Sequence, residues 1–115
     1  FMGGIIAYTN DVKINILGID AALIDQHSVV SEEVANAMAD AAREKFGTTW
    51  GIATTGIAGP GPYEGIAEGT VWIAIRGPIN QTLQLQLDSG REAIRTGAIS
   101  SAIGTFSRIL SFRAK

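Results

Sequence analysis

Hydrophobic and polar residues alternate with a period of two over much of the second half of this chain. In GTVWIAIR, residues 69–76, β-branched side chains occupy every second position, which is typical of a strand. The turn residues GPIN follow, and QTLQLQLD, residues 81–88, alternates again. The two runs therefore predict an antiparallel hairpin whose second strand exposes one face through Gln84 and Gln86.

Two shorter apolar runs predict further strands. Gly3–Thr9 (GGIIAYT) is expected to be a buried strand. Thr49–Thr55 (TWGIATT) is expected to be a short strand that continues into a glycine-rich loop.

Helical spacing of apolar residues is clearest between Ser31 and Gly47. Ser31 is a suitable N-cap, acidic residues follow it in the first turn, and Gly47 is a suitable C-terminal glycine. The stretch 20–30 before this helix predicts a loop with one helical turn at 21–24. Strands and helices together predict an α/β domain, with helices covering a mixed parallel and antiparallel sheet.

A long helix is expected from Ser89 or Gly90 to the end of the chain. Gly97 and Gly104 weaken this helix, each by about 1 kcal/mol, and suggest close packing against another element. Its predicted buried stripe consists of Ile99, Ile103, Phe106 and Leu110.

A short helix is predicted over Val12–Leu17, with Asn10 or Asp11 as N-cap and Gly18 after its end. This assignment places Lys13 in the first helical turn, where the helix dipole disfavours a cation. The dipole and partial burial would both lower the lysine pKa from about 10.4 towards neutrality, as a general base requires.

Composition excludes several classes of function. The chain has 115 residues, enough for one domain spanning 1–115, with 46% hydrophobic residues and 17% charged residues. It has no cysteine and one histidine, so disulfides, thiolate metal sites and multi-histidine metal centres are excluded. The net charge of −2 gives no electrostatic reason to expect nucleic acid. No apolar run is long enough for a membrane span and no signal peptide is visible, so we expect no membrane partner. The absence of cysteine favours a cytoplasmic setting.

The loop Thr54–Gly61 (TTGIAGPG) follows a predicted strand, where backbone N–H groups often bind anions. The glycine order differs from the dinucleotide fingerprint, and no G-K-[ST] motif is present. A ligand-binding loop and a purely structural turn, stiffened by proline, therefore both remain open. One hypothesis for the function is an unrelated phosphate-binding α/β domain that uses this loop.

The segments GGIIAYTNDVKINILGI, VSEEVANAMADAAREKFG, IATTGIAGPGP and GTVWIAI together resemble the C-terminal domain of the CinA family. This resemblance covers essentially the whole chain. It implies a three-layer α/β/α fold and a nicotinamide-nucleotide amidase, which converts nicotinamide mononucleotide to nicotinic acid mononucleotide and ammonia without a cofactor or metal.

The resemblance also implies roles for individual residues. Tyr8 and Lys13 match the tyrosine and lysine of AYxNxxK, which assist a nucleophilic serine. Thr55 and Gly56 match the threonine-glycine that lines the nucleotide site, beside Thr54. An arginine of the final helix holds the ligand, and its matches are Arg95 and Arg91. The family's serine turn, of the type E-S-x-T-G-G, has no match in this sequence, so we expect the nucleophile to lie before Phe1.

Each of these residues also has a simpler interpretation. Tyr8 is a common core residue of strands, and Lys13 beside Asp11 is typical of a solvated surface pair. Arg91 and Arg95 fit a solvated helix face. The remaining candidates for chemistry, namely His27, Trp50 and Trp72, are expected to be a loop histidine and two core residues.

Two main functions therefore follow from the sequence. The first is an amidohydrolase that depends on residues before Phe1. The second is a truncated, non-catalytic relative that binds a nucleotide or assembles with copies of itself. Without an N-terminal helix, one face of the sheet would be apolar and open, so we expect further chain or another subunit to cover it. A homo-oligomer is the expected state.

Overall fold

The computed structural model describes residues 1–87 and 90–114. In chain order its elements are α1 (Asn10–Asn15), α2 (Ala21–His27), α3 (Glu32–Phe46), β1 (Gly51–Gly56), β2 (Thr70–Arg76), β3 (Gln81–Gln86) and α4 (Arg91–Ala114). Our predictions for Asp88 and Ser89 lie outside the described residues, and α4 begins at Arg91. None of the described helices is both long enough and apolar enough to cross a bilayer.

The three strands form an antiparallel sheet in the order β1-β2-β3. The predicted hairpin is confirmed, since β2 and β3 pair with Ile73 opposite Leu83. Gln84 and Gln86 are exposed, as predicted. Every described strand pairing is antiparallel, so these strands do not supply the parallel part of the predicted mixed sheet.

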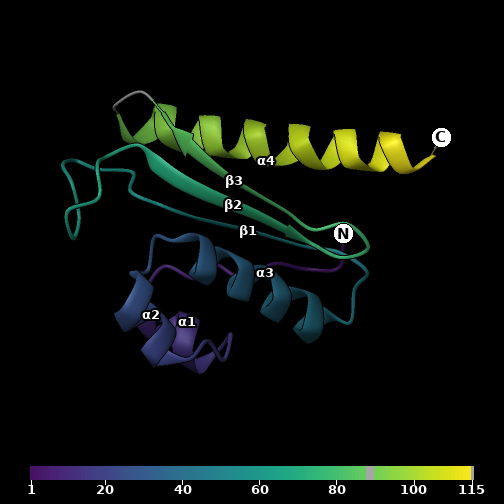
Figure 1. The fold of residues 1–115 in the computed structure, drawn as a ribbon, viewed down its shortest axis with the longest axis horizontal. Coiled ribbons are helices and arrows are strands. Elements are labelled where there is room, and N and C mark those ends of the chain that lie inside the picture. The colour runs from purple at the N-terminus through teal and green to yellow at the C-terminus, as the bar shows by residue number, and fades with distance from the viewer. Residues whose placement is uncertain (88–89, 115) are drawn as a thin grey trace.

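Helices lie against both faces of this sheet (Figure 1). On one face α3 packs with a cluster that includes Val34, Ala39 and Ala74. On the other face α4 packs against Val71 and Ile73. β2 is the central strand and is buried on both sides, which explains its nearly continuous apolar sequence. The result is a mixed helix-and-sheet fold.

The predicted caps of α3 are confirmed. The Ser31 hydroxyl accepts a hydrogen bond from the Val34 N–H at 3.2 Å, and Gly47 ends the helix with a φ of 60°. The predicted turn at 21–24 is longer than expected and forms α2, which Asp20 caps.

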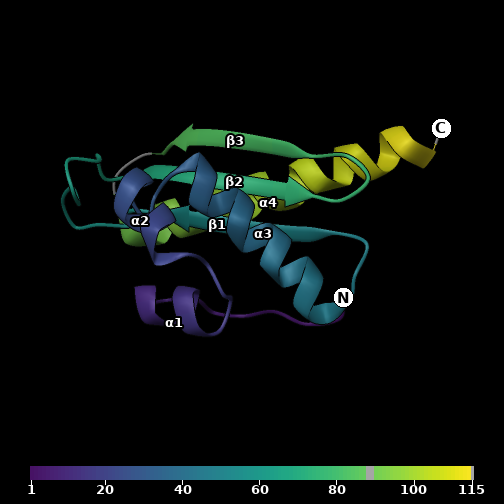
Figure 2. The same ribbon diagram turned by 60° about the horizontal axis from the view of Figure 1, so that its bottom comes forward.

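The predicted strand Gly3–Thr9 is wrong. The segment runs in an extended path from the N-terminus to α1 and forms no strand pairing (Figure 2). Its apolar pattern fits a strand, but a strand also needs a partner within hydrogen-bonding distance, and β1 lies across a cavity.

The predicted buried stripe of the last helix is also wrong, because a different face of the helix is buried. Ile99, Ile103 and Leu110 are 57%, 64% and 42% exposed. Phe106 is partly buried against the Trp50 ring. The face towards the sheet consists instead of Ile94, Ala98, Ala102, Thr105 and Ile109.

Small side chains explain why this face of α4 is the buried one, because they let the helix approach the sheet closely. At Gly97 an added Cβ would lie 3.0 Å from the Leu87 side chain, as we expected for a closely packed glycine. The same expectation for Gly104 is wrong, since an added Cβ there would have only Arg108 within 4 Å, at 3.8 Å.

Candidate functional site

A polar cavity of about 560 Å³ is lined by α1 and the loop after β1, two segments that both lie at the left of Figure 2. Its walls come from the start of α1, the segment before α3, the glycine-rich loop and the start of α4. The lining residues are Tyr8, Thr9, Asn10, Lys13, Val29, Val30, residues 55–63 and Arg91.

Lys13 projects from α1, and its position in that helix differs from our prediction. The Thr9 hydroxyl caps the helix by accepting from the Val12 N–H at 3.2 Å, so α1 begins at Asn10. Lys13 therefore lies in the last turn of this short helix. The N-cap assignment to Asn10 or Asp11 is wrong because the threonine hydroxyl one residue earlier serves as the cap.

The Lys13 side chain is buried, with 6% of the residue exposed. Its Nζ donates a hydrogen bond to the Ala7 carbonyl oxygen at 2.7 Å. Asp11 accepts instead from Asn15 at 3.0 Å, so the solvated Lys13–Asp11 pair does not form. Burial lowers the pKa of the Lys13 ammonium below its ordinary value, because desolvation penalises the charged form. Of the two causes predicted from the sequence, burial is confirmed, whereas the helix dipole is not, since Lys13 lies in the last turn of α1.

Tyr8 lies at the rim of the same cavity and is 79% exposed. This exposure contradicts the interpretation of Tyr8 as a core residue of a strand. The described partner of the Lys13 ammonium is Ala7 rather than the Tyr8 hydroxyl. Within residues 1–87 and 90–114, no residue forms a hydrogen bond with the Tyr8 hydroxyl.

The end of β1 lines the cavity next to the glycine-rich loop. Thr55 lines the cavity, but its hydroxyl donates to the Val29 carbonyl at 2.8 Å and thereby joins β1 to the segment before α3. Gly56 follows it on the cavity wall. Thr54 points to the other face of the strand and lines a second, larger cavity. The structure thus brings Thr55 and Gly56, but not Thr54, to Lys13.

The glycine-rich loop after β1 lines the cavity and contains backbone donors without a described partner. No described residue accepts a hydrogen bond from the N–H groups of Ala58 and Gly59. Gly59 and Gly61 have φ values of 81° and 80°, a conformation that glycine adopts at little cost. Successive unpaired N–H groups of this kind form concave sites for anions.

The two candidate arginines have different positions. Arg91, the first residue of α4, lines the cavity, and its Nη1 donates to the Gly59 carbonyl at 3.2 Å. Arg95 is exposed one turn later and does not line the cavity. The solvated-face interpretation therefore fits Arg95, whereas Arg91 places a positive charge beside the loop.

Sequence reasoning missed the residue that holds the loop in shape. Glu68 accepts a hydrogen bond from the Gly61 N–H at 2.8 Å, and its carboxylate packs where a Gly59 Cβ would lie. Between these residues, Tyr63 and Ile66 pair across a tight turn. Glu64 and Gly65 at its centre have φ values of 50° and 76°, but Glu-Gly is not a usual hairpin signal, and the contact of Glu68 with the loop depends on the fold.

The other singled-out residues lie away from this cavity. His27 ends α2, with Nδ1 3.5 Å from a Glu33 carboxylate oxygen. Trp50 packs edge-to-face with Phe106, and Trp72 packs against the α3 cluster. Within residues 1–87 and 90–114, no three histidine or acidic side chains are grouped as metal ligands.

Comparison with known proteins identifies the family. The model of the CinA C-terminal domain matches residues 1–110. The chain belongs to the CinA family. A CinA-like protein of Frankia casuarinae is 41% identical over 112 residues, which cover 96% of this chain and 26% of that protein. A CinA-like protein of Synechocystis is 47% identical over 100 residues, 83% of this chain and 24% of that protein. The chain thus spans about a quarter of the length of the curated relatives it matches.

Solved structures of CinA proteins have the same fold. The competence-damaged protein (CinA) superfamily protein of Escherichia coli matches with a TM-score of 0.85 and 31% identity, over 89% of this chain and 60% of that chain. A CinA superfamily protein of Klebsiella pneumoniae matches with a TM-score of 0.87 and 28% identity, over 91% of this chain and 67% of that chain. The chain therefore has homologues described as competence- or damage-inducible proteins.

Proposed function

We propose that this chain is the larger part of an amidohydrolase domain that converts nicotinamide mononucleotide to nicotinic acid mononucleotide and ammonia. The observation that supports this most is the buried Lys13, whose pKa is lowered, in the same cavity as the glycine-rich loop and Arg91. The CinA family resemblance supplies the substrate, and the cavity supplies groups that suit it.

The ligand's phosphate fits the side of the cavity formed by the loop. Arg91 provides a positive charge there, and the N–H groups of Ala58 and Gly59 provide neutral donors. The carboxamide would then lie towards Lys13 and Tyr8, which line the same cavity. This division places the phosphate and the reacting group at different ends of one site.

Lys13 is suited to act as the general base. In its neutral form the Nζ accepts the proton of a serine hydroxyl, and the serine oxygen attacks the carboxamide carbon. The carbon–nitrogen bond breaks as ammonia leaves with a proton, and water then cleaves the resulting ester to release the acid and restore the serine. Burial favours this role because it keeps the amine neutral at lower pH.

The CinA resemblance implies that the serine comes from outside residues 1–115. No described serine lines the Lys13 cavity. Residues 1–115 alone are therefore expected to bind the nucleotide without cleaving it. The two functions that the sequence left open, an amidohydrolase and a non-catalytic nucleotide-binding relative, are then compatible. Residues 1–115 alone would behave as the second, and the longer polypeptide as the first.

The test is ammonia release from nicotinamide mononucleotide by the polypeptide that includes the residues encoded before Phe1. Lys13→Ala should lower the rate by about 10²- to 10⁴-fold, the usual contribution of a general base. Lys45→Ala, which changes an exposed lysine of α3, should leave the rate unchanged. Full activity of the Lys13→Ala variant would refute the proposal.

A further inference from the structure

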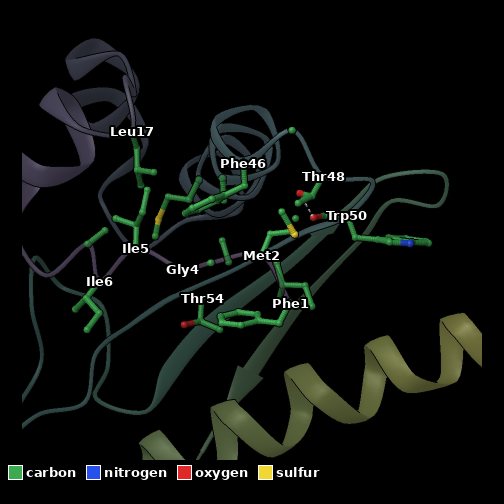
Figure 3. A pocket seen from close by; sticks show the side chains of 18 of the residues that line it. Phe1, Met2, Gly4, Ile5, Ile6, Leu17, Phe46, Thr48, Trp50 and Thr54 are labelled. Atoms are coloured by element: carbon green, nitrogen blue, oxygen red, sulfur yellow. Dashed lines mark hydrogen bonds between the residues drawn. The ribbon is translucent and has the colours of Figure 1, made fainter.

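Two cavities border β1, and they differ in their chemistry. The larger one, of about 910 Å³, is lined mainly by apolar side chains such as Phe1, Met2 and Phe46 (Figure 3). No charged side chain is among the described residues that line it. The polar cavity is lined by Lys13 and Arg91 and is therefore the one suited to a charged ligand.

One residue of the polar cavity, Tyr63, has no role in the proposed reaction. It belongs to the loop after β1 and lines the same cavity as Lys13 and Arg91. It is 49% exposed, so about half of its surface is covered by protein and half is open. The open half is aromatic surface that a ligand can bury, and burial of such surface favours binding.

The backbone fixes the position of Tyr63. Its N–H donates to the Ile66 carbonyl at 3.0 Å, and its carbonyl accepts from the Ile66 N–H at 2.8 Å. Glu64 and Gly65 close this turn with φ values of 50° and 76°. Pro62, directly before Tyr63, restricts the chain further, because its ring fixes φ. Tyr63 therefore lies at the start of a closed turn rather than on an open loop.

The rest of this loop is also held by hydrogen bonds. At its base Ile57 donates to the Thr70 carbonyl at 3.0 Å and accepts from the Gly69 N–H at 2.8 Å. Within the loop, the Glu68 carboxylate accepts from the Gly61 N–H at 2.8 Å. The loop is thus joined at its base, its middle and its tip, so a ring that it carries can bind a ligand with little loss of conformational entropy.

The proposed substrate carries a positive charge for which the cavity has no acidic partner. In nicotinamide mononucleotide the ring nitrogen is bonded to ribose, so the ring is a pyridinium cation. No aspartate or glutamate is among the described residues that line the polar cavity. The face of an aromatic ring also attracts a cation. Among the described residues, the aromatic side chains of this lining belong to Tyr8 and Tyr63.

We propose that Tyr63 contacts the pyridinium ring and gives the site a preference for a charged ring. Tyr8 is the weaker candidate, because it is 79% exposed and no described residue forms a hydrogen bond with its backbone. The CinA resemblance also assigns Tyr8 to the serine chemistry. The contact with Tyr63 rests on the proposed function, which supplies the charged ring.

The contact fits the order of groups along the nucleotide. The ring is separated from the phosphate by the ribose, and it carries the carboxamide on its other side. With the phosphate at Arg91 and the carboxamide at Lys13, the ring lies between these two residues. The loop that offers the N–H groups of Ala58 and Gly59 to the phosphate can therefore reach the ring through Tyr63, four positions later.

Equilibrium binding of two nucleotides that differ in ring charge tests the proposal. Nicotinamide mononucleotide and its reduced dihydro form share the phosphate, the ribose and the carboxamide, but the reduced ring is neutral. Calorimetric titrations use the polypeptide that includes the residues encoded before Phe1, with Lys13→Met so that the substrate is not cleaved. Tyr63→Leu should weaken binding of the charged nucleotide about 3- to 30-fold, as loss of a cation–aromatic contact does. Binding of the reduced nucleotide should weaken less, and Tyr63→Phe, which keeps the ring, should bind both as its parent does.

Ribose 5-phosphate, which lacks the ring, is the control ligand, and its affinity should not depend on Tyr63. Unchanged binding of nicotinamide mononucleotide by Tyr63→Leu would overturn the proposal. Equal losses for the two nucleotides would also overturn it, and so would an equal loss for ribose 5-phosphate, which would indicate a purely structural role.

The outcome is separable from that of the proposed function. The expected loss of affinity in Tyr63→Leu, without ammonia release by the longer polypeptide that retains Lys13, would refute the amidohydrolase and leave the ring contact. Ammonia release that depends on Lys13, with nucleotide affinity independent of Tyr63, would refute the ring contact alone.

Discussion

Replacing Lys13 by methionine should stabilise the fold at neutral pH, although it should abolish the proposed chemistry. The residue is only 6% exposed, and the described partner of its ammonium is one carbonyl oxygen, that of Ala7. Burying a charge costs several kcal/mol, and a hydrogen bond from a charged donor returns about 1.5–3 kcal/mol. Methionine has a similar length and no charge, so the net gain should be about 1–2 kcal/mol.

The pH dependence gives the sign of this effect. The pKa of Lys13 is lower in the folded state than in the unfolded chain, so between these two values the unfolded state binds more protons. The unfolding free energy of the wild type should therefore rise with pH across that window, up to the ordinary lysine pKa. The Lys13→Met variant should lack this rise, and its advantage should vanish once the unfolded lysine is also neutral.

Urea denaturation followed by circular dichroism between pH 6 and 10 measures both quantities. Lys45→Met, at an exposed site of α3, is the control and should leave the pH slope as it is. At neutral pH the Lys13→Met gain corresponds to about 4–8 °C in melting temperature for a domain of this size. A loss of stability in Lys13→Met, or an unchanged pH slope, would show that the ammonium is well solvated and would refute the reasoning.

Three further variants test the loop and the last helix. Arg91→Ala should weaken nucleotide binding by about 10- to 100-fold in calorimetric titrations, because a charged contact is lost, whereas Arg95→Ala should leave binding unchanged. Equal effects of the two variants would contradict the position of Arg91, but not Arg95, in the cavity wall. Glu68→Ala should lower stability by about 1 kcal/mol and weaken nucleotide binding, because the Gly61 N–H loses its acceptor. Glu68→Gln should retain most of the stability and most of the nucleotide binding. Gly104→Ala should raise stability by about 0.5–1 kcal/mol in thermal denaturation, because the space around Gly104 is open. Gly97→Ala should raise stability less, because its new methyl group would press on Leu87. A larger gain for Gly97→Ala than for Gly104→Ala would contradict the packing of α4.

Local signals in the sequence predicted much of this fold. The caps of α3 and the β2–β3 hairpin depend on residues within a few positions of one another, and both are found where the pattern places them. The CinA resemblance also implied that Tyr8, Lys13 and the loop after β1 belong to one site. The structure places all three around one cavity.

Predictions that depend on partners distant in the sequence were less successful. The apolar stripe of the last helix has two candidate phases, and small residues such as Ala98 and Ala102 face the sheet because they permit close packing. The segment Gly3–Thr9 has the sequence of a strand but has no neighbour to pair with among the described residues. The choice of Arg91 over Arg95, and the contact of Glu68 with the loop, follow from the positions of elements that the sequence pattern does not give.

The central claim is that Lys13 loses its proton more readily than an ordinary lysine. Titration of its ¹³Cε resonance by NMR tests this directly. We expect Lys13 to titrate clearly below the ordinary lysine pKa. Titration at the ordinary lysine pKa, with the fold intact, would contradict a general-base role for Lys13.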